Sequence, residues 1–165
     1  MTELADYNGY SGKERMTKYY DMQRRIASRE LQPKGSCEIC GDSGEDLEYH
    51  EEDYSKPYSW VKPEAYIVCK HCHIQKIRKR FQYPDRWKAF LAHARRGGHA
   101  SDLYGKTANP ELRREFEACC EAIKVGRTYV FRPLRNYSQD AGNEWFANLS
   151  LDQEAMKNRA SRPRP

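Results

Sequence analysis

Two Cys-x-x-Cys pairs constrain this chain more than any other feature: Cys37 with Cys40, and Cys69 with Cys72. A Cys-x-x-Cys turn presents two thiolates from one knuckle, and two such turns supply the four soft ligands of a tetrahedral zinc ion. Because all four positions are taken by protein ligands, the predicted Zn²⁺ is structural and has no open position for a substrate. Binding of the ion then contributes directly to the free energy of folding.

The composition explains why such an ion is needed. Only 38% of the 165 residues are hydrophobic and 32% are charged, and the mean hydropathy is −1.04. A chain of this kind has a small core and depends on a metal, an oligomer or a ligand. No apolar run approaches the roughly 20 residues that cross a bilayer, and no secretory signal is visible. We therefore expect a cytoplasmic protein with no membrane association, from a bacterium or a phage-infected host, in which paired cysteines bind metal.

Hydrophobic spacing and capping residues predict the elements around the cysteines. Ser11 and Glu14 form a capping box at the start of the first helix, and Asn109 with Pro110 starts the last one. Cys119 and Cys120 lie on its apolar face and are expected to be small buried residues. The pattern predicts helices over 12–31, 84–96 and 110–125, strands over 47–53, 65–69 and 127–134, and a basic helix from Lys70.

The expected fold class is α+β: a small zinc-bound β-hairpin plus helix, with flanking helices. The chain divides into a basic helical arm (1–35), a zinc-binding core (36–82), a helical extension (83–135) and a C-terminal segment with a basic tail (136–165). The extension carries no chemistry that the sequence reveals. We expect it to mediate homo-oligomerisation or docking of a protein partner.

Histidines and carboxylates gather around the cysteines. They are His50, Glu51, Glu52, Asp53, His71 and His73. A zinc ion shared by both knuckles would force the strand and the helix that carry these residues together. Two histidines beside carboxylates can bind a second divalent ion, which activates water and stabilises a phosphorane-like charge. We expect His71 to face solvent or to hydrogen-bond a thiolate.

The stretch YHEEDYSKP followed by IVCKHCH resembles the zinc-bearing HNH, or ββα-metal, nucleases over about residues 36–80. The resemblance implies a β-hairpin and helix that grip a metal and cleave DNA phosphodiester bonds. His50 matches the first histidine of the family motif, and His73 matches the histidine after the last Cys-x-x-Cys. The implied catalytic residues are His50, Glu51 and His73, and the implied Mg²⁺ or Mn²⁺ ligands are His50, Asp53 and His73.

Two departures from the family pattern keep an alternative open. Glu51 stands where the family commonly has a second histidine, and no asparagine lies between His50 and His73. Glu51 can serve as base or metal ligand, since carboxylates do both. The departures equally fit a catalytically inactive zinc module that binds DNA, RNA or a protein partner, such as a regulator or a phage accessory protein.

Basic residues follow the second knuckle directly: Lys70, Lys76, Arg78, Lys79 and Arg80. Phosphate contacts need such charges and make binding sensitive to salt. Acidic residues gather instead in GEDLEYHEED, close to the proposed metal site. This segregation predicts nucleic acid, and most simply DNA, as the partner.

Overall fold

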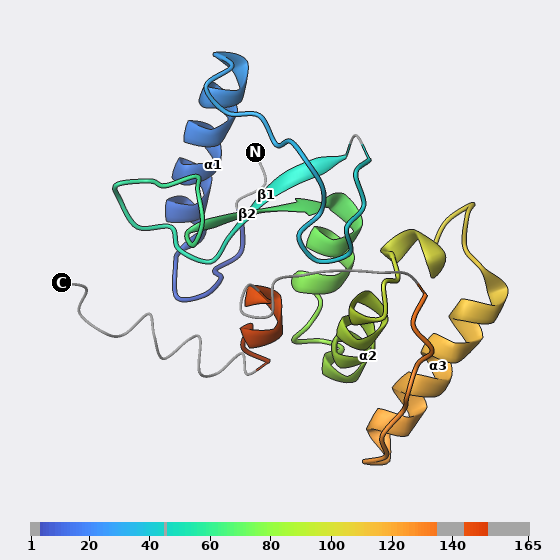
Figure 1. Ribbon diagram of the computed structural model, residues 1–165. Coiled ribbons are helices and arrows are strands. Elements are labelled where there is room, and N and C mark those ends of the chain that lie inside the picture. Colours follow the sequence, from blue (N-terminus) through green and yellow to red (C-terminus); the bar gives the residue numbers. More distant parts are fainter. Residues whose placement is uncertain (1–3, 45, 135–143, 152–165) are drawn as a thin grey trace. The chain divides into compact units, whose positions relative to one another are not determined.

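The computed structural model describes residues 4–44, 46–134 and 144–151, and it confirms the α+β class (Figure 1). The predicted basic tail at the end of the chain lies outside the described residues. The described helices are too short or too polar to cross a bilayer. The elements are α1 (Gly12–Ala27), β1 (Leu47–Glu51), β2 (Ala65–Cys69), the π-helical turn η1 (His71–Ile77), α2 (Pro84–Arg95), η2 (Ala100–Asp102), α3 (Pro110–Lys124) and η3 (Trp145–Asn148).

Local sequence signals explain the helix boundaries. The Ser11 hydroxyl accepts a hydrogen bond from the Glu14 amide, and the Glu14 carboxylate accepts one from the Ser11 amide, as the capping box requires. The Asn109 side chain caps α3 through the amides of Glu111 and Leu112. α1 ends before the predicted residue 31, because Arg29 adopts a left-handed backbone with φ of 62°.

The strand predicted over 127–134 is wrong, since these residues form no strand. β-propensity alone does not make a strand without a partner strand, and in the described chain β1 and β2 pair with each other only. Instead, the amide of Leu134 donates to the carbonyl of Arg96 at the end of α2.

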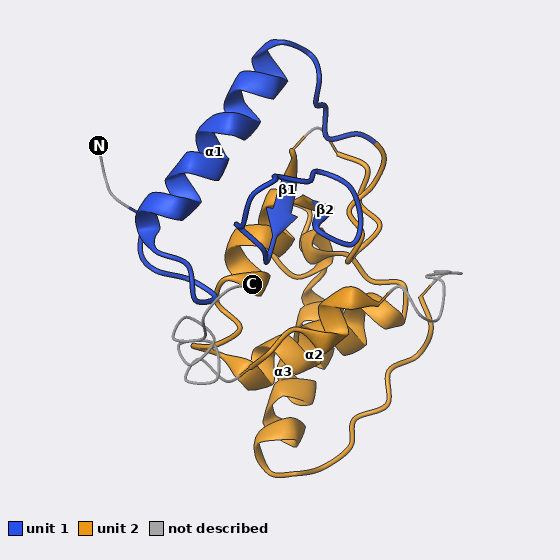
Figure 2. Ribbon diagram, turned by 90° about the vertical axis from the view of Figure 1, so that its left-hand side faces the viewer, with its two compact units in different colours: residues 1–34, 49–67, 152–165 blue, residues 35–48, 68–151 orange. Residues whose placement is uncertain are grey.

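The chain forms two compact units, coloured separately in Figure 2. In the described chain, the first comprises residues 4–34 and 49–67, and the second comprises 35–44, 46–48, 68–134 and 144–151. β1 and β2 pair as a two-stranded antiparallel sheet, and the division passes through both strands. It therefore differs from the boundaries expected from sequence, which kept 36–82 together.

The first unit packs aromatic side chains around a buried lysine. Tyr49, Trp60 and Ala65 form its small apolar cluster. Lys18 is 1% exposed, and its ammonium donates to the carbonyl of Asp53 at 2.7 Å and lies 4.9 Å from the centre of the Trp60 ring. Burial lowers the pKa of Lys18, whereas the charge of Glu51 opposes that change. This cation is thus held by a carbonyl, aromatic faces and a nearby carboxylate.

The second unit has the larger core, built where α2 and α3 pack together. Trp87 and Phe90 of α2 meet Phe116 and Cys120 of α3 in one buried cluster. Cys119 and Cys120 are buried as expected and form no disulfide. Polar contacts tie the same two helices together, since Arg86 forms a two-point ion pair with Glu117 at 2.8 Å.

His93 lies at the centre of a buried polar network in this unit, a role that the sequence did not indicate. Its Nδ1 accepts from the Arg96 guanidinium at 3.0 Å, while its Nε2 lies 3.2 Å from the Asp102 carboxylate. This pattern requires a neutral ring with its hydrogen on Nε2. The packing is tight, because a Cβ on Gly98 would lie 2.2 Å from Nε2.

Acid should destabilise the protein through His93. Burial, reinforced by the Arg96 charge, lowers the pKa of His93 to about 4, whereas an unfolded histidine titrates near 6.5. Between these values the unfolded chain binds more protons, so stability falls as the pH drops, by about 3 kcal/mol at pH 4. Denaturant unfolding at pH 7, 6 and 5 measures this loss. His93→Gln should show a flatter pH dependence, and an identical dependence in both proteins would contradict the assignment.

Candidate metal centre

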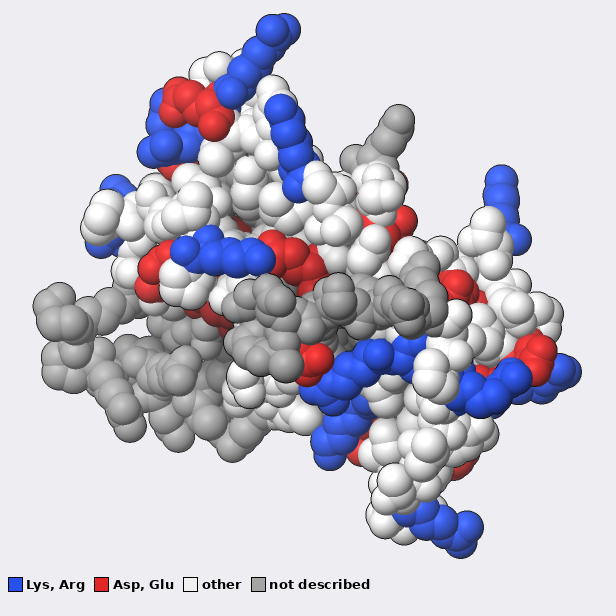
Figure 3. Space-filling view, in the orientation of Figure 1, with Lys and Arg blue, Asp and Glu red and all other residues white. Residues whose placement is uncertain are grey.

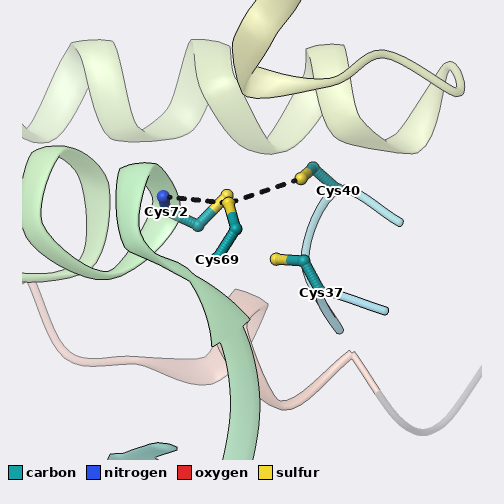
Figure 4. Close-up of side chains that lie close together, drawn as sticks. All are labelled: Cys37, Cys40, Cys69 and Cys72. Atoms are coloured by element: carbon teal, nitrogen blue, oxygen red, sulfur yellow. Dashed lines mark hydrogen bonds between the residues drawn. The ribbon is translucent and has the colours of Figure 1, made fainter. Parts of the chain in front are cut away.

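Four cysteine side chains converge in the second unit. The sulfur atoms of Cys37, Cys40, Cys69 and Cys72 all lie within 4.8 Å of one another, and all four residues are buried. Figure 4 shows the sulfur atoms pointing toward a common centre, from the loop before β1 and from the end of β2 and the start of η1. Within the described chain, no other group of three or more metal-ligating side chains lies close enough together to bind an ion.

Backbone hydrogen bonds shape each knuckle. In the first, the amide of Gly41 donates to the carbonyl of Cys37, and the amide of Cys37 donates to the carbonyl of Asp42. Gly41 has φ of 76°, a conformation that favours glycine. In the second, the amide of Cys72 donates to the sulfur of Cys69 at 3.4 Å. These hydrogen bonds close both turns around the four sulfur atoms.

The spacing of the sulfur atoms fits a tetrahedral ion. Zinc–sulfur bonds of about 2.3 Å place tetrahedral ligands about 3.8 Å apart. The Cys40 and Cys69 sulfur atoms lie 3.9 Å apart (Figure 4). Four thiolates with this spacing can hold a metal ion such as zinc.

The pKa values of the neighbouring thiols also favour a bound cation. Hydrogen bonds from Cys40 and Cys69 hold the pKa of Cys37 well below its usual range. Burial raises the pKa of Cys72 well above its usual value. Four thiolates cannot all ionise in so small a buried volume without positive charge, and a divalent cation supplies that charge.

The residues matched to the first histidine motif lie in the first unit. His50 is 2% exposed and its Nε2 lies 2.8 Å from the Glu52 carboxylate. Glu52 also accepts a hydrogen bond from the hydroxyl of Tyr7 at 2.7 Å. The Asp53 carboxylate accepts from the Tyr10 hydroxyl and from the amide and hydroxyl of Ser55. Hydrogen bonds within the unit thus hold His50 and Asp53 in place.

Glu51, the predicted base or ligand, is also buried in the first unit, at 8% exposure. Its charge acts on the buried ammonium of Lys18. Neither described unit by itself brings His50, Glu51, Asp53 or His73 into a second group of metal ligands. The catalytic ion site therefore stays a prediction.

His73, the residue matched to the second motif, lies on η1 in the second unit and is 8% exposed. Its Nδ1 lies 2.7 Å from the carboxylate of Glu48. This contact is the main reason why the pKa of Glu48 is lowered. A carboxylate on one ring nitrogen is the arrangement that orients a histidine for metal binding through the other.

The five basic residues predicted to contact nucleic acid divide into two groups. Lys70, Arg78 and Lys79 are exposed. Lys76 and Arg80 are buried, at 6% and 1% exposure, so they do not share the exposed surface of the other three, and their contact with nucleic acid stays a prediction. Arg80 donates to the carbonyls of Ser150 and Ile77, which satisfy its guanidinium inside the protein. His71 is exposed, as expected, and stacks on Tyr104.

Metal analysis tests the cysteine site. We expect about one tightly bound metal ion per purified chain, and none in Cys72→Ser, because an alcohol is a poor ligand for a soft ion. The metal-free chain should be largely unfolded, since the bound ion contributes folding free energy. Cys119→Ala is the matched control: it removes a buried thiol elsewhere and should keep its metal. Equal metal content in parent and Cys72→Ser would contradict the site.

Comparisons with protein-family models, with curated proteins and with solved structures gave no match. The function is therefore argued from the site itself.

Proposed function

We propose that this chain is a zinc-stabilised nucleic-acid-binding protein, in which the four-cysteine site holds a phosphate-binding surface in shape. The observation that carries the proposal is the position of Lys70, Arg78 and Lys79. Lys70 lies between two of the cysteines, and the other two follow η1 directly. An ion bound at Cys69 and Cys72 therefore fixes the turn on which these cations are displayed.

Zinc is the ion that the donor set favours. Soft thiolates select zinc over the hard ions Mg²⁺ and Ca²⁺, and four buried thiolates make a closed structural site. The ion would be held by Cys37, Cys40, Cys69 and Cys72. It would supply rigidity and charge neutralisation, not reactivity.

The exposed cations are available for phosphate. Lys70, Arg78 and Lys79 form no ion pair within the described chain, and residues 70–83 contain no acid. The charges of Lys70 and Arg78 act on Glu48 and, after its contact with His73, help to lower the pKa of its carboxyl. On the face shown in Figure 3, lysines and arginines occur in separate groups with acids beside them. The proposed surface is therefore local, and it suits a few phosphate contacts.

Binding to duplex DNA at several salt concentrations tests this surface. Lys70→Gln/Arg78→Gln should weaken binding about tenfold at low salt, and it should reduce the slope of log affinity against log salt by about two. Lys88→Gln/Arg114→Gln is the matched control, because it removes one exposed lysine and one exposed arginine elsewhere in the same unit. An equal effect of both double variants would rule out a specific surface.

Metal-dependent cleavage of DNA is a second candidate function, favoured by one further observation. His73 directly follows a cysteine of the metal centre and is oriented by Glu48 through Nδ1. In the proposal, this pair would help to hold a divalent ion such as Mg²⁺ or Mn²⁺ on the scissile phosphate. β1, β2 and η1 follow one another in the order of a ββα-metal hairpin and helix.

A plasmid-nicking assay tests this candidate. Zinc-loaded protein with added Mg²⁺ or Mn²⁺ should nick supercoiled plasmid, and His73→Ala should reduce the rate at least a hundredfold while retaining its zinc. His71→Ala, a neighbouring exposed histidine on the same turn, is the matched control and should cleave normally. Absence of cleavage with every metal, together with salt-dependent binding, would leave the chain as a binding module.

A further inference from the structure

A cavity of about 330 Å³ opens in the second unit beside η1 and α2. Three cationic side chains line it: Lys76 and Lys79 from the η1 region, and Arg86 from α2. Tyr83, Trp87 and Tyr104 add aromatic surface, and none of the described residues that line the cavity is acidic. The walls thus combine positive charge with aromatic rings, which favours an anion that carries a planar group.

Lys76 supplies a buried positive charge without a carboxylate partner. It is 6% exposed, and its ammonium donates to the hydroxyl of Tyr104 at 3.1 Å. Around it lie the rings of Phe90, Tyr104 and Phe116, at 5.0, 4.2 and 5.4 Å from the ring centres. In the described chain Lys76 forms no ion pair. Aromatic faces offset only part of the cost of burying a cation, so an anion in the cavity would complete its surroundings.

The second cation, Arg86, is already neutralised. Its guanidinium forms the two-point ion pair with Glu117 and also donates to the Tyr104 hydroxyl at 3.0 Å. Tyr104 therefore accepts two hydrogen bonds from cations through one oxygen. Its hydroxyl hydrogen has no acceptor within the described residues, and it is available to an oxygen-rich anion in the cavity.

The rim carries a free aromatic ring and a free cation. Tyr83 is 45% exposed, and its ring makes no ring–ring or cation–π contact with a described residue. Lys79 is exposed and forms no ion pair there either. Exposed aromatic rings provide stacking surfaces for bases of any sequence, whereas a free lysine is a mobile phosphate ligand.

We propose that this cavity binds a nucleoside monophosphate, with the phosphate at Lys76, Lys79 and the Tyr104 hydroxyl, and the base against Tyr83. The volume agrees with the ligand, because pockets for small molecules begin at about 300 Å³. The same chemistry is offered by a free nucleotide and by the phosphorylated end of a nucleic-acid strand. The inference goes beyond the proposed surface of Lys70, Arg78 and Lys79, since the cavity shares only Lys79 with that surface.

Calorimetric titration of the metal-loaded full chain with AMP, adenosine and inorganic phosphate tests the assignment. AMP should bind most tightly, because it alone engages both the cations and the ring. Lys79→Gln should weaken AMP binding about tenfold, as expected for one charge-assisted contact. Tyr83→Ala should weaken it by a similar factor through lost stacking, whereas Tyr83→Phe should restore it.

Lys88→Gln is the matched control, since it removes an exposed charge on α2 that does not line the cavity. Its AMP affinity should equal that of the parent. Failure of AMP to bind at millimolar concentration would overturn the proposal. Equal affinity for AMP and phosphate, with no effect of Tyr83→Ala, would also overturn it by showing a simple anion site.

A second titration identifies the source of the ligand. The ligands are a short single strand with a 5′-phosphate and the same strand with a 5′-hydroxyl. If strand ends are the ligand, the 5′-phosphorylated strand should bind more tightly than both its 5′-hydroxyl counterpart and AMP. If free nucleotides are the ligand, the 5′-phosphorylated strand should bind more weakly than AMP. Lys70→Gln/Arg78→Gln should leave AMP binding unchanged. Binding of AMP without binding of duplex DNA would therefore overturn the proposed surface and support the cavity.

Discussion

Four buried sulfur atoms in a small volume are the constraint on which the rest of the second unit depends. Their mutual contacts and burial make four negative thiolates unfavourable without a cation, and the spacing fits a tetrahedral ion. The site links the loop before β1 to the end of β2 and the start of η1. Because η1 and the residues beside it carry both the exposed cations and part of the cavity wall, a metal ion bound by the cysteines would also fix the surfaces proposed to meet phosphate.

The second unit buries several cations, and it satisfies them in different ways. Arg80 donates to backbone carbonyls, and Arg96 pairs with Glu115 and His93. Lys76 has aromatic rings and one phenol, but no carboxylate in the described chain. Buried charges are usually paired, because desolvation is costly. The exception therefore points to a ligand, whereas Arg80 has backbone carbonyls and Arg96 has the carboxylate of Glu115 as partners.

In the first unit, the residues that resemble a nuclease motif also hold the structure together. His50 contacts Glu52, Asp53 closes a turn through Ser55 and Tyr10, and the charge of Glu51 acts on Lys18. These contacts give the motif a structural role that does not require catalysis. His73 differs, because its contact with Glu48 is of the kind that orients metal-binding histidines. The substitution of His73 is therefore more informative about cleavage than that of His50.

The sequence by itself determined the elements that depend on local chemistry. The capping residues Ser11 and Asn109 located α1 and α3, and the spacing of the cysteines indicated a metal site, because both signals act over a few residues. The sequence could not show which charges within Lys70–Arg80 are exposed and which are buried, since the pattern of basic residues is the same in both cases. Only the tertiary structure decided that Lys76 faces a cavity with Tyr104, that Arg80 is internal and that His93 is neutral. Their partners lie on other elements, and burial is set by packing between elements distant in sequence.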